Sequence, residues 1–222
     1  SAQVPEMVRD ALQDAMQVAL GNVPRVKGNV VVCPDVSGSM SSPATGYRKG
    51  ATSAVRCIDV AALVAAALLR RNPTARVLPF ENDVVDVHLN ARDTVMTNAA
   101  KLAAVGGGGT NCSAPLAQLV REKADVDLVV FVSDNQSWVD ATQNAHQGTA
   151  TMQEWQKLKV NNPKARLVCI DIQPYATTQA KPRADVLNVG GFSDRVFDVV
   201  GTMLSSNGDP DHWVRTIEAV EL

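Results

Sequence analysis

The sequence predicts an α/β fold, with a doubly wound, mostly parallel central sheet that has one antiparallel edge strand and helices on both faces. Two observations predict it. Short apolar runs alternate along the chain with longer segments of helical pattern, which is typical of a parallel sheet covered on both sides. The run at residues 57–71 is apolar on nearly every side apart from Asp59, as expected for a helix pressed onto a sheet.

The pattern places the elements in order along the chain. Residues 75–80 and 84–88 are predicted to form an antiparallel hairpin at one sheet edge, because a short polar turn at 81–83 joins them. Asp93 is expected to cap the next helix, and Pro115 suits the first turn of the helix after it. The remaining strands are predicted at 29–33, 127–133, 165–172 and 186–189, and the helices at 5–20, 57–71, 94–104, 114–123, 151–160 and 193–204.

Length and charge favour one compact domain. The 222 residues are 45% hydrophobic, enough for one core, so we expect a single domain over 1–222 with an N-terminal helical extension (1–26), a core (27–205) and a tail (206–222). We find no internal repeat. The net charge of −2 predicts no general attraction to phosphate backbones or anionic membranes. Arg48, Lys49 and Arg56 flank one loop, and solvated surface charge is the favoured interpretation of them.

Oxygen donors follow three of the segments at loop positions. Asp35, Ser37 and Ser39 follow the apolar run 29–33, Thr110 follows four glycines, and Asp134 follows the apolar run 127–132. Mg²⁺ prefers oxygen ligands at about 2.0–2.1 Å and keeps several waters. Two carboxylates would neutralise the ion, whereas the hydroxyls add no negative charge and leave it able to accept an acidic ligand. The residues therefore predict a site for Mg²⁺, or for Mn²⁺ or Ca²⁺, and not for a soft metal.

These residues resemble the metal-ion-dependent adhesion site (MIDAS) of von Willebrand factor A domains. The pattern of that site is D-x-S-x-S followed by a distant Thr and a distant Asp, and all five positions match over about residues 27–205. The resemblance implies that Asp35, Ser37, Ser39, Thr110 and Asp134 hold the ion, some of them through water. It also implies the Rossmann-like fold of that family.

Two segments resemble more narrowly the A domain of the Ro autoantigen, or TROVE, family. They are G-G-T-N-C-S-A-P at 108–115 and V-F-V-S-D-N-Q-S at 130–137. Asn111 stands where that family usually has Asp, and Ser133 where it has Thr. Ro proteins join this domain to a ring of helical repeats that binds RNA, and the ring has no counterpart in these residues. The resemblance implies the A domain of a ribonucleoprotein, with RNA as an indirect partner only.

Cysteine usage points to a reducing cytoplasm. Cys33, Cys57, Cys112 and Cys169 show no C-x-x-C spacing, so we expect small buried hydrophobes and no zinc site. Cys112 at a helix start is expected to pack against the metal loop. No signal peptide or membrane span is apparent, and a cytoplasmic monomer is expected.

The first functional hypothesis is a protein-binding module whose bound ion accepts a carboxylate from a partner. A metal-assisted phosphoester hydrolase and a purely structural metal site stay open as alternatives. Because His88, His146 and His212 lie in no recognisable triad, we expect no enzyme activity. Ligands bind where the loops at the carboxyl ends of the strands converge, so the candidate partner contacts are Ser41, Tyr47, Asn135, Ser137 and Trp138.

Overall fold

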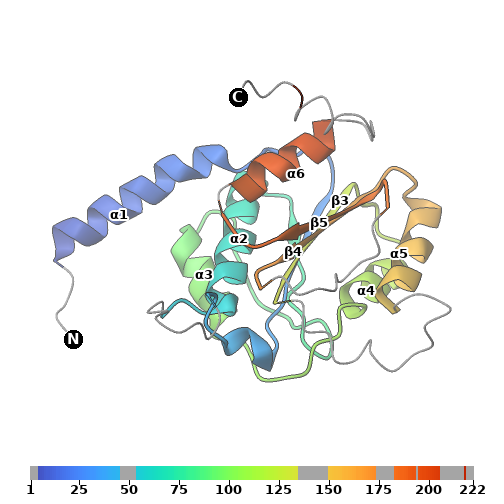
Figure 1. The fold of residues 1–222 in the computed structure, drawn as a ribbon, viewed down its shortest axis with the longest axis horizontal. Coiled ribbons are helices and arrows are strands. Elements are labelled where there is room, and N and C mark those ends of the chain that lie inside the picture. Colours follow the sequence, from blue (N-terminus) through green and yellow to red (C-terminus); the bar gives the residue numbers. More distant parts are fainter. Residues whose placement is uncertain are drawn as a thin grey trace.

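A parallel sheet forms the centre of the molecule in the computed structural model, which describes residues 5–45, 54–134, 150–173, 183–193, 195–205 and 218 (Figure 1). Within these residues the strand order is β2-β1-β3-β4-β5, and every strand pair is parallel. The predicted α/β fold with a parallel sheet is therefore confirmed. The strands are β1 (Val30–Pro34), β2 (Arg76–Val77), β3 (Leu128–Ser133), β4 (Arg166–Asp171) and β5 (Val186–Gly190).

Strands β1 and β3 are buried at every residue, because helices cover both faces of the sheet. Alternate residues face opposite sides. Val30 and Val32 belong to one apolar cluster, whereas Val31 and Cys33 belong to the other. The continuous apolar runs in the sequence thus reflect burial on two sides at once.

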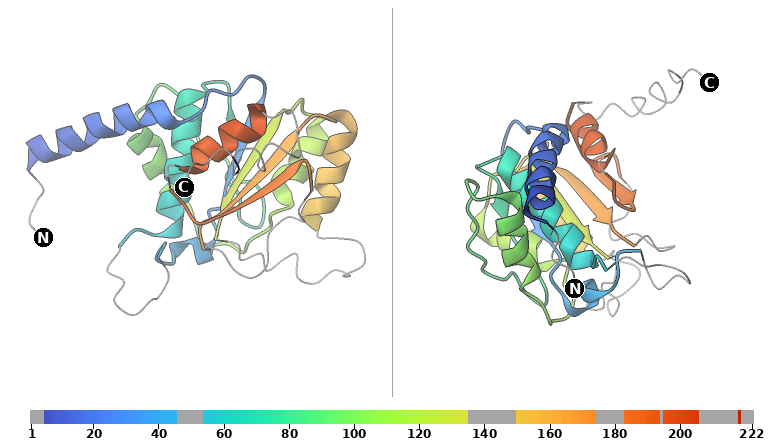
Figure 2. Two further views of the ribbon diagram at one scale, coloured as in Figure 1. Left: turned by 45° about the horizontal axis from the view of Figure 1, so that its top comes forward. Right: turned by 90° about the vertical axis from the view of Figure 1, so that its left-hand side faces the viewer.

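Helices α2, α3 and α6 lie on one side of the sheet, and α4 and α5 on the other (Figures 1 and 2). On the second side Trp155 is fully buried, and Met152 and Leu158 of the same helix are buried with it. The helices are α1 (Glu6–Ala19), α2 (Cys57–Arg71), α3 (Val95–Ala103), α4 (Ala114–Glu122), α5 (Ala150–Asn161) and α6 (Arg195–Ser205), with 3-10 turns η1 (Leu20–Asn22) and η2 (Gly38–Ser41).

The predicted antiparallel edge strand at 84–88 does not form a strand. A single antiparallel bridge joins Phe80 to Val84, and the chain beyond it is extended without a ladder. Val85, Val87 and Leu89 are partly buried against the core on the α2 side. The alternating pattern that suggested a hairpin therefore reports packing of every second side chain, and not pairing with β2.

The capping residue of α3 differs from the prediction. Thr94, and not Asp93, caps α3, because its hydroxyl accepts a hydrogen bond from the backbone N–H of Thr97 at 3.1 Å. Asp93 instead pairs with Lys101 at 3.0 Å. Pro115 lies in the first turn of α4 as predicted. Asp59 of α2 accepts a bond from the backbone N–H of Arg56 at 2.9 Å, which explains the polar residue in that apolar helix.

Helix α1 extends away from the body of the domain (Figure 2) and has no buried residue. Leu20 and Val23, just after it, are buried and join the core. No helix among the described residues is long and apolar enough to cross a membrane. The predicted tail, 206–222, lies outside the described residues apart from Glu218.

Two helix-to-strand connections share one construction, although the sequence analysis found no repeat. Asn72 follows α2 in the stretch N-P-T-A-R, and Asn162 follows α5 in N-P-K-A-R. The side-chain oxygens of these two residues accept hydrogen bonds from the backbone N–H groups of Val26 (2.8 Å) and Val126 (2.9 Å), respectively. Each buried asparagine thus ties a helix end to the segment that leads into a central strand.

We expect Asn162→Ala to lower the free energy of unfolding by about 1–3 kcal/mol, because it leaves the buried N–H of Val126 without its acceptor. The control is Asn161→Ala, an exposed neighbour, which should change stability by less than about 0.5 kcal/mol. Urea unfolding followed by circular dichroism measures both. Equal midpoints for the two variants would contradict the assigned role.

Candidate metal centre at the carboxyl edge of the sheet

Asp35 leaves the carboxyl end of β1 as a fully buried carboxylate. Its backbone N–H donates to the carbonyl of Val132 at 2.9 Å, which fixes it beside the end of β3. Its Oδ1 accepts from the backbone N–H of Ser37 at 2.9 Å, and its Oδ2 accepts from the hydroxyl of Ser133 at 2.7 Å. Burial raises the pKa of Asp35 to about 6, although the hydrogen bonds from Ser37 and Ser133 oppose the rise.

Three hydroxyls form a chain beside this carboxylate. Thr110 donates from its hydroxyl to that of Ser37 at 2.8 Å, and Ser37 shares a hydrogen bond of 3.2 Å with Ser39. Ser37 and Thr110 are buried, whereas Ser39 is half-buried. Residues separated by 73 positions in the sequence are thus in direct contact, as the sequence predicted.

The glycine run explains how Thr110 reaches this position. Gly106 and Gly107 have φ values of +151° and +129°, which residues other than glycine rarely adopt. Gly108 donates its N–H to the carboxylate of Glu81 at 2.8 Å, and a Cβ on Gly108 would lie 2.5 Å from that carboxyl group. The carbonyl of Gly108 accepts from the N–H of Gly38 at 2.9 Å, so the glycine loop is joined to the loop that carries Ser37 and Ser39.

Asp134 completes the predicted set from the end of β3. It is fully buried, and its negative charge contributes to the raised pKa of Asp35. The same charge raises the pKa of Asp171, so the carboxyl groups of all three residues lie in one electrostatic neighbourhood. The structure therefore brings together Asp35, Ser37, Ser39 and Thr110 through hydrogen bonds, and Asp134 through its electrostatic effect on Asp35.

The sequence analysis missed two residues of this edge. Ser133 donates to Asp35, and Asp171 ends β4 as a third buried carboxylate. Asp171 pairs in register with Ser133, and burial followed by the charge of Asp134 raises its pKa to about 7. A signal was present, because Asp171 ends an apolar run much as Asp134 does. It has no place in the D-x-S-x-S, Thr, Asp pattern, which explains the omission.

The rim predictions fall mostly outside the described residues. Ser41 is exposed in η2 near the site, whereas Tyr47, Asn135, Ser137 and Trp138 lie in the segments that the structure does not describe. The four cysteines are buried thiols. Burial raises the pKa of Cys57 to about 12, with further contributions from Asp134 and Asp35. Cys112 packs in the apolar cluster on the α4 side.

The donor set fits a hard divalent cation. Carboxylate and hydroxyl oxygens are the ligands that Mg²⁺, Mn²⁺ and Ca²⁺ accept, and the set includes neither thiolate nor imidazole. Burying carboxylates this close together costs free energy unless a positive charge compensates them. The Oδ1 atom of Asp171 is also buried and accepts no hydrogen bond from any described residue. A cation bound here would compensate the buried negative charges and would give the Oδ1 atom of Asp171 a partner.

Comparison with known proteins identifies the family. The family model described as the Ro60 vWA domain matches residues 29–204. The chain belongs to this family of Ro60 von Willebrand factor A domains. It is 30% identical over 189 residues to the RNA-binding protein RO60 of Deinococcus radiodurans, an alignment that covers 85% of this chain and 34% of that protein.

A solved structure supports the fold of this Ro60 vWA domain. The crystal structure of the Deinococcus radiodurans RO (RSR) protein matches with a TM-score of 0.66 and 24% identity, over 91% of this chain and 38% of that one. The chain therefore spans about a third of the length of these relatives. The resemblance to the Ro and von Willebrand factor A families stated above is confirmed.

The raised pKa values predict a pH dependence for the protein in EDTA. Asp35 (about 6) and Asp171 (about 7) lie above the ordinary value of 3.8, so the folded state binds protons more tightly than the unfolded chain between about pH 4 and 7. The free energy of unfolding should fall by several kcal/mol as pH rises through this window, because each unit of pKa corresponds to about 1.4 kcal/mol. Urea unfolding at pH 4.5 and 7.5 measures the change.

The matched variant is Asp171→Asn, which removes one titrating carboxyl group with little change of shape. It should flatten the profile and be more stable than the parent at pH 7.5 in EDTA, with little difference at pH 4.5. If the free energy of unfolding of the parent rises between pH 4.5 and 7.5, the buried carboxylates do not govern its pH dependence.

Proposed function

We propose that this Ro60 vWA domain is a metal-dependent protein-binding module with a MIDAS-type site for Mg²⁺, or for Mn²⁺ or Ca²⁺. The proposed ligands are Asp35, Ser37, Ser39, Thr110 and Asp134. The observation that carries the proposal is the hydrogen-bonded set Thr110, Ser37 and Ser39, which lies beside the buried carboxylate of Asp35. These four residues come from two loops that lie far apart in the sequence, one after β1 and one after the glycine run.

The residues around the ligands set the properties of such a site. Ser133 holds one oxygen of Asp35, and the N–H of Ser37 holds the other, so this carboxylate is fixed in orientation. Glu81 holds the glycine loop by its bond to Gly108, which positions Thr110. A bound divalent ion would supply a Lewis-acidic centre for a carboxylate ligand of a partner protein. The neutral hydroxyls keep the net charge of the site low enough for that ligand.

The arrangement favours binding over hydrolysis. A metal-assisted hydrolase requires a group that can accept a proton from water. Asp35 and Asp134 would be held by the ion as ligands, and the hydroxyls of Ser37, Ser39 and Thr110 are poor bases at neutral pH. Asp171 is a further carboxylate described at this edge, and it is buried away from solvent water. We therefore propose that the protein is not an enzyme. The group that the site would recognise is the carboxylate of an Asp or Glu side chain on the surface of the partner.

The relatives suggest the wider setting. The Deinococcus radiodurans protein is named as RNA-binding and is about three times as long as the alignment. We propose that this domain serves a Ro-like ribonucleoprotein in the cytoplasm, as a monomer, and provides its contact with a protein. Its sequence match to the relative supports this assignment.

Metal binding is tested by thermal unfolding in EDTA, Mg²⁺, Mn²⁺ and Ca²⁺. A ligand that binds only the folded state should stabilise it by about 2.7 kcal/mol when its concentration is 100 times the dissociation constant. We expect the unfolding temperature to rise with Mg²⁺ concentration in the parent and in Cys112→Ala, and not in Asp134→Ala or Thr110→Ala. No shift with any of the three ions would overturn the metal site.

Protein binding is tested by comparing the proteins that the immobilised chain retains in Mg²⁺ with those that it retains in EDTA. A partner that needs the ion should be lost in EDTA and with Thr110→Ala. If the ion binds but the same proteins are retained in EDTA and with Thr110→Ala, a purely structural metal would be favoured. Turnover of a generic phosphoester that requires Mg²⁺ and disappears in Asp35→Ala would establish the hydrolase instead.

A further inference from the structure

The opposite edge of the sheet, where the strands begin, carries two hollows. Because every strand of the described sheet is parallel, these starts lie together and far from the candidate metal centre (Figure 1). One hollow of about 710 Å³ lies beside the start of β4, and another of about 420 Å³ lies beside the end of α2. The segment from Arg25 to Lys27 borders both, so the hollows adjoin.

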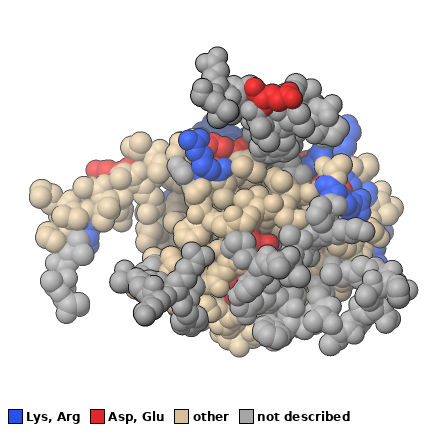
Figure 3. Space-filling view, in the orientation of Figure 1, with Lys and Arg blue, Asp and Glu red and all other residues tan. Residues whose placement is uncertain are grey.

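Positive charge is concentrated at these hollows. Among the described residues that line them, the larger hollow has two carboxylates, Asp127 and Asp185, and the smaller one has none. These described linings contain eight Lys and Arg residues but two Asp and Glu residues, in a chain of net charge −2. Figure 3 shows blue side chains gathered at the upper right, around the end of α5. We call these eight cations the basic edge: Arg25, Lys27, Arg70, Arg71, Lys159, Lys164, Arg166 and Arg183.

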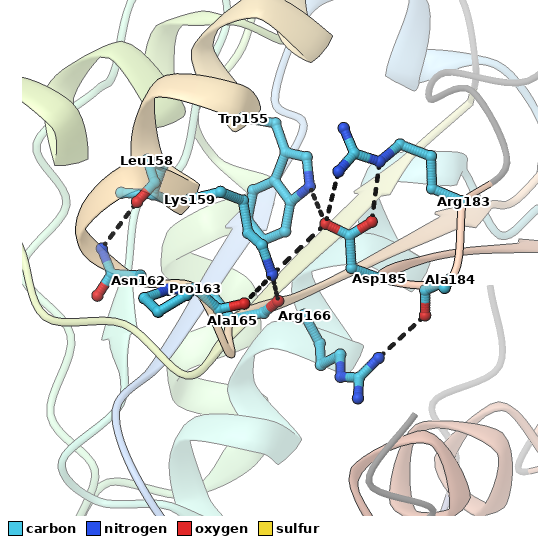
Figure 4. A network of polar contacts seen from close by, with 10 residues as sticks. All are labelled: Trp155, Leu158, Lys159, Asn162, Pro163, Ala165, Arg166, Arg183, Ala184 and Asp185. Carbon is cyan, nitrogen blue, oxygen red and sulfur yellow. Dashed lines mark hydrogen bonds and ion pairs between the residues drawn. The ribbon is translucent and has the colours of Figure 1, made fainter. Parts of the chain in front are cut away.

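Asp185 is already engaged by its neighbours, as Figure 4 shows. It accepts from the indole N–H of Trp155 at 3.1 Å and from Arg183 at 2.9 Å, and the ammonium group of Lys159 lies 3.5 Å away. Lys159 also donates to the carbonyl of Ala165 at 2.8 Å. These contacts hold Asp185 in place beside the larger hollow and compensate its negative charge. Asp185 is the more buried of the two carboxylates there.

The outer cations have no such partner. The side chains of Arg25, Lys27 and Lys164 are exposed and make no hydrogen bond or ion pair with any described residue. Arg166 donates one N–H to the carbonyl of Ala184 at 2.9 Å, which leaves its positive charge uncompensated. Arg70 and Arg71 likewise bond to backbone carbonyls and not to carboxylates.

Helix ends account for part of this charge but not for all of it. Arg70 and Arg71 lie in the last turn of α2, and Lys159 lies in the last turn of α5, where cations complement the helix dipole. Arg25, Lys27 and Lys164 lie outside the helices. Helix stabilisation therefore leaves the outer members of the basic edge unexplained.

We propose that the basic edge binds the sugar-phosphate backbone of RNA directly. A run of exposed Lys and Arg matches a polymer with one phosphate per nucleotide, and such contacts are independent of sequence. The described lining of the larger hollow is charged apart from Pro163 and Ala184, so this part of it lacks the apolar anchors that a protein partner would need. The proposal revises the expectation that a net charge of −2 predicts no attraction to phosphate.

The test measures binding of fluorescent oligouridylate to the 222-residue chain in EDTA, between about 50 and 200 mM KCl. The parent should bind, and Lys27→Ala combined with Lys164→Ala should bind about tenfold more weakly at the lowest salt. The slope of log affinity against log salt should fall by about 1.4, since each phosphate contact on a single strand contributes about 0.7.

The matched control combines Arg9→Ala with Arg195→Ala, which removes the same charge from exposed positions outside the basic edge. The control should keep the parental affinity and slope. The proposal fails if the parent does not bind oligouridylate, if the control loses as much affinity as the basic-edge variant, or if polyglutamate competes as well as unlabelled RNA. The last result would assign the edge to an acidic protein.

The expected RNA binding does not depend on metal binding. Because the assay contains EDTA, and because Asp134→Asn alters the opposite edge, RNA binding should be unchanged by that variant. Loss of RNA binding in Asp134→Asn would contradict a separate basic edge. Loss of the Mg²⁺-dependent thermal shift alone would leave RNA binding intact.

Discussion

The register between β1 and β3 is the constraint on which both edges of this domain depend. Pro34 lies opposite Val132, so the chain leaves both strands at the same level and delivers Asp35 and Asp134 to one buried point. A slip of one residue would turn every side chain of β1 to the other face of the sheet. The two apolar clusters oppose such a slip, because Val30 and Val32 pack on one side and Val31 and Cys33 pack on the other. Core packing thus fixes the position of the polar site.

The same parallel topology separates the charges of the domain. Acidic residues end or follow β1, β3 and β4 at the carboxyl edge. The opposite edge has more cations, before β1 and β4, than carboxylates, which are Asp127 before β3 and Asp185 before β5. Both edges exist because every strand of the described sheet points in one direction. The net charge of −2 is a sum over the whole chain, so it does not show the difference between the two edges. The sum predicts no general attraction to phosphate, but local fields, and not the sum, decide encounters with a polyanion.

The elements of the core could be predicted because their burial is local and continuous. The apolar run at α2 is long enough to specify a helix by itself, and the valine-rich run of β1 specifies a doubly buried strand. The hairpin at 84–88 was wrong because extended chain that packs on a core has the same period as a paired strand. Asp171 was missed because a residue outside a known motif shows its burial only after the strands are assembled.

Asn111 illustrates how a departure from the family pattern can be understood from contacts. Its side-chain N–H donates to the carbonyl of Asn82 at 3.1 Å, while its oxygen accepts from the hydroxyl of Ser113 at 2.7 Å. An aspartate could keep the second bond but not the first, because a carboxylate has no proton to donate. The amide therefore ties the Thr110 loop to the turn that carries Glu81, and it does so without adding negative charge beside the buried carboxylates. Asn111 and Ser133 thus support the site as neutral donors, whereas Glu81 supports it as a charged acceptor through Gly108.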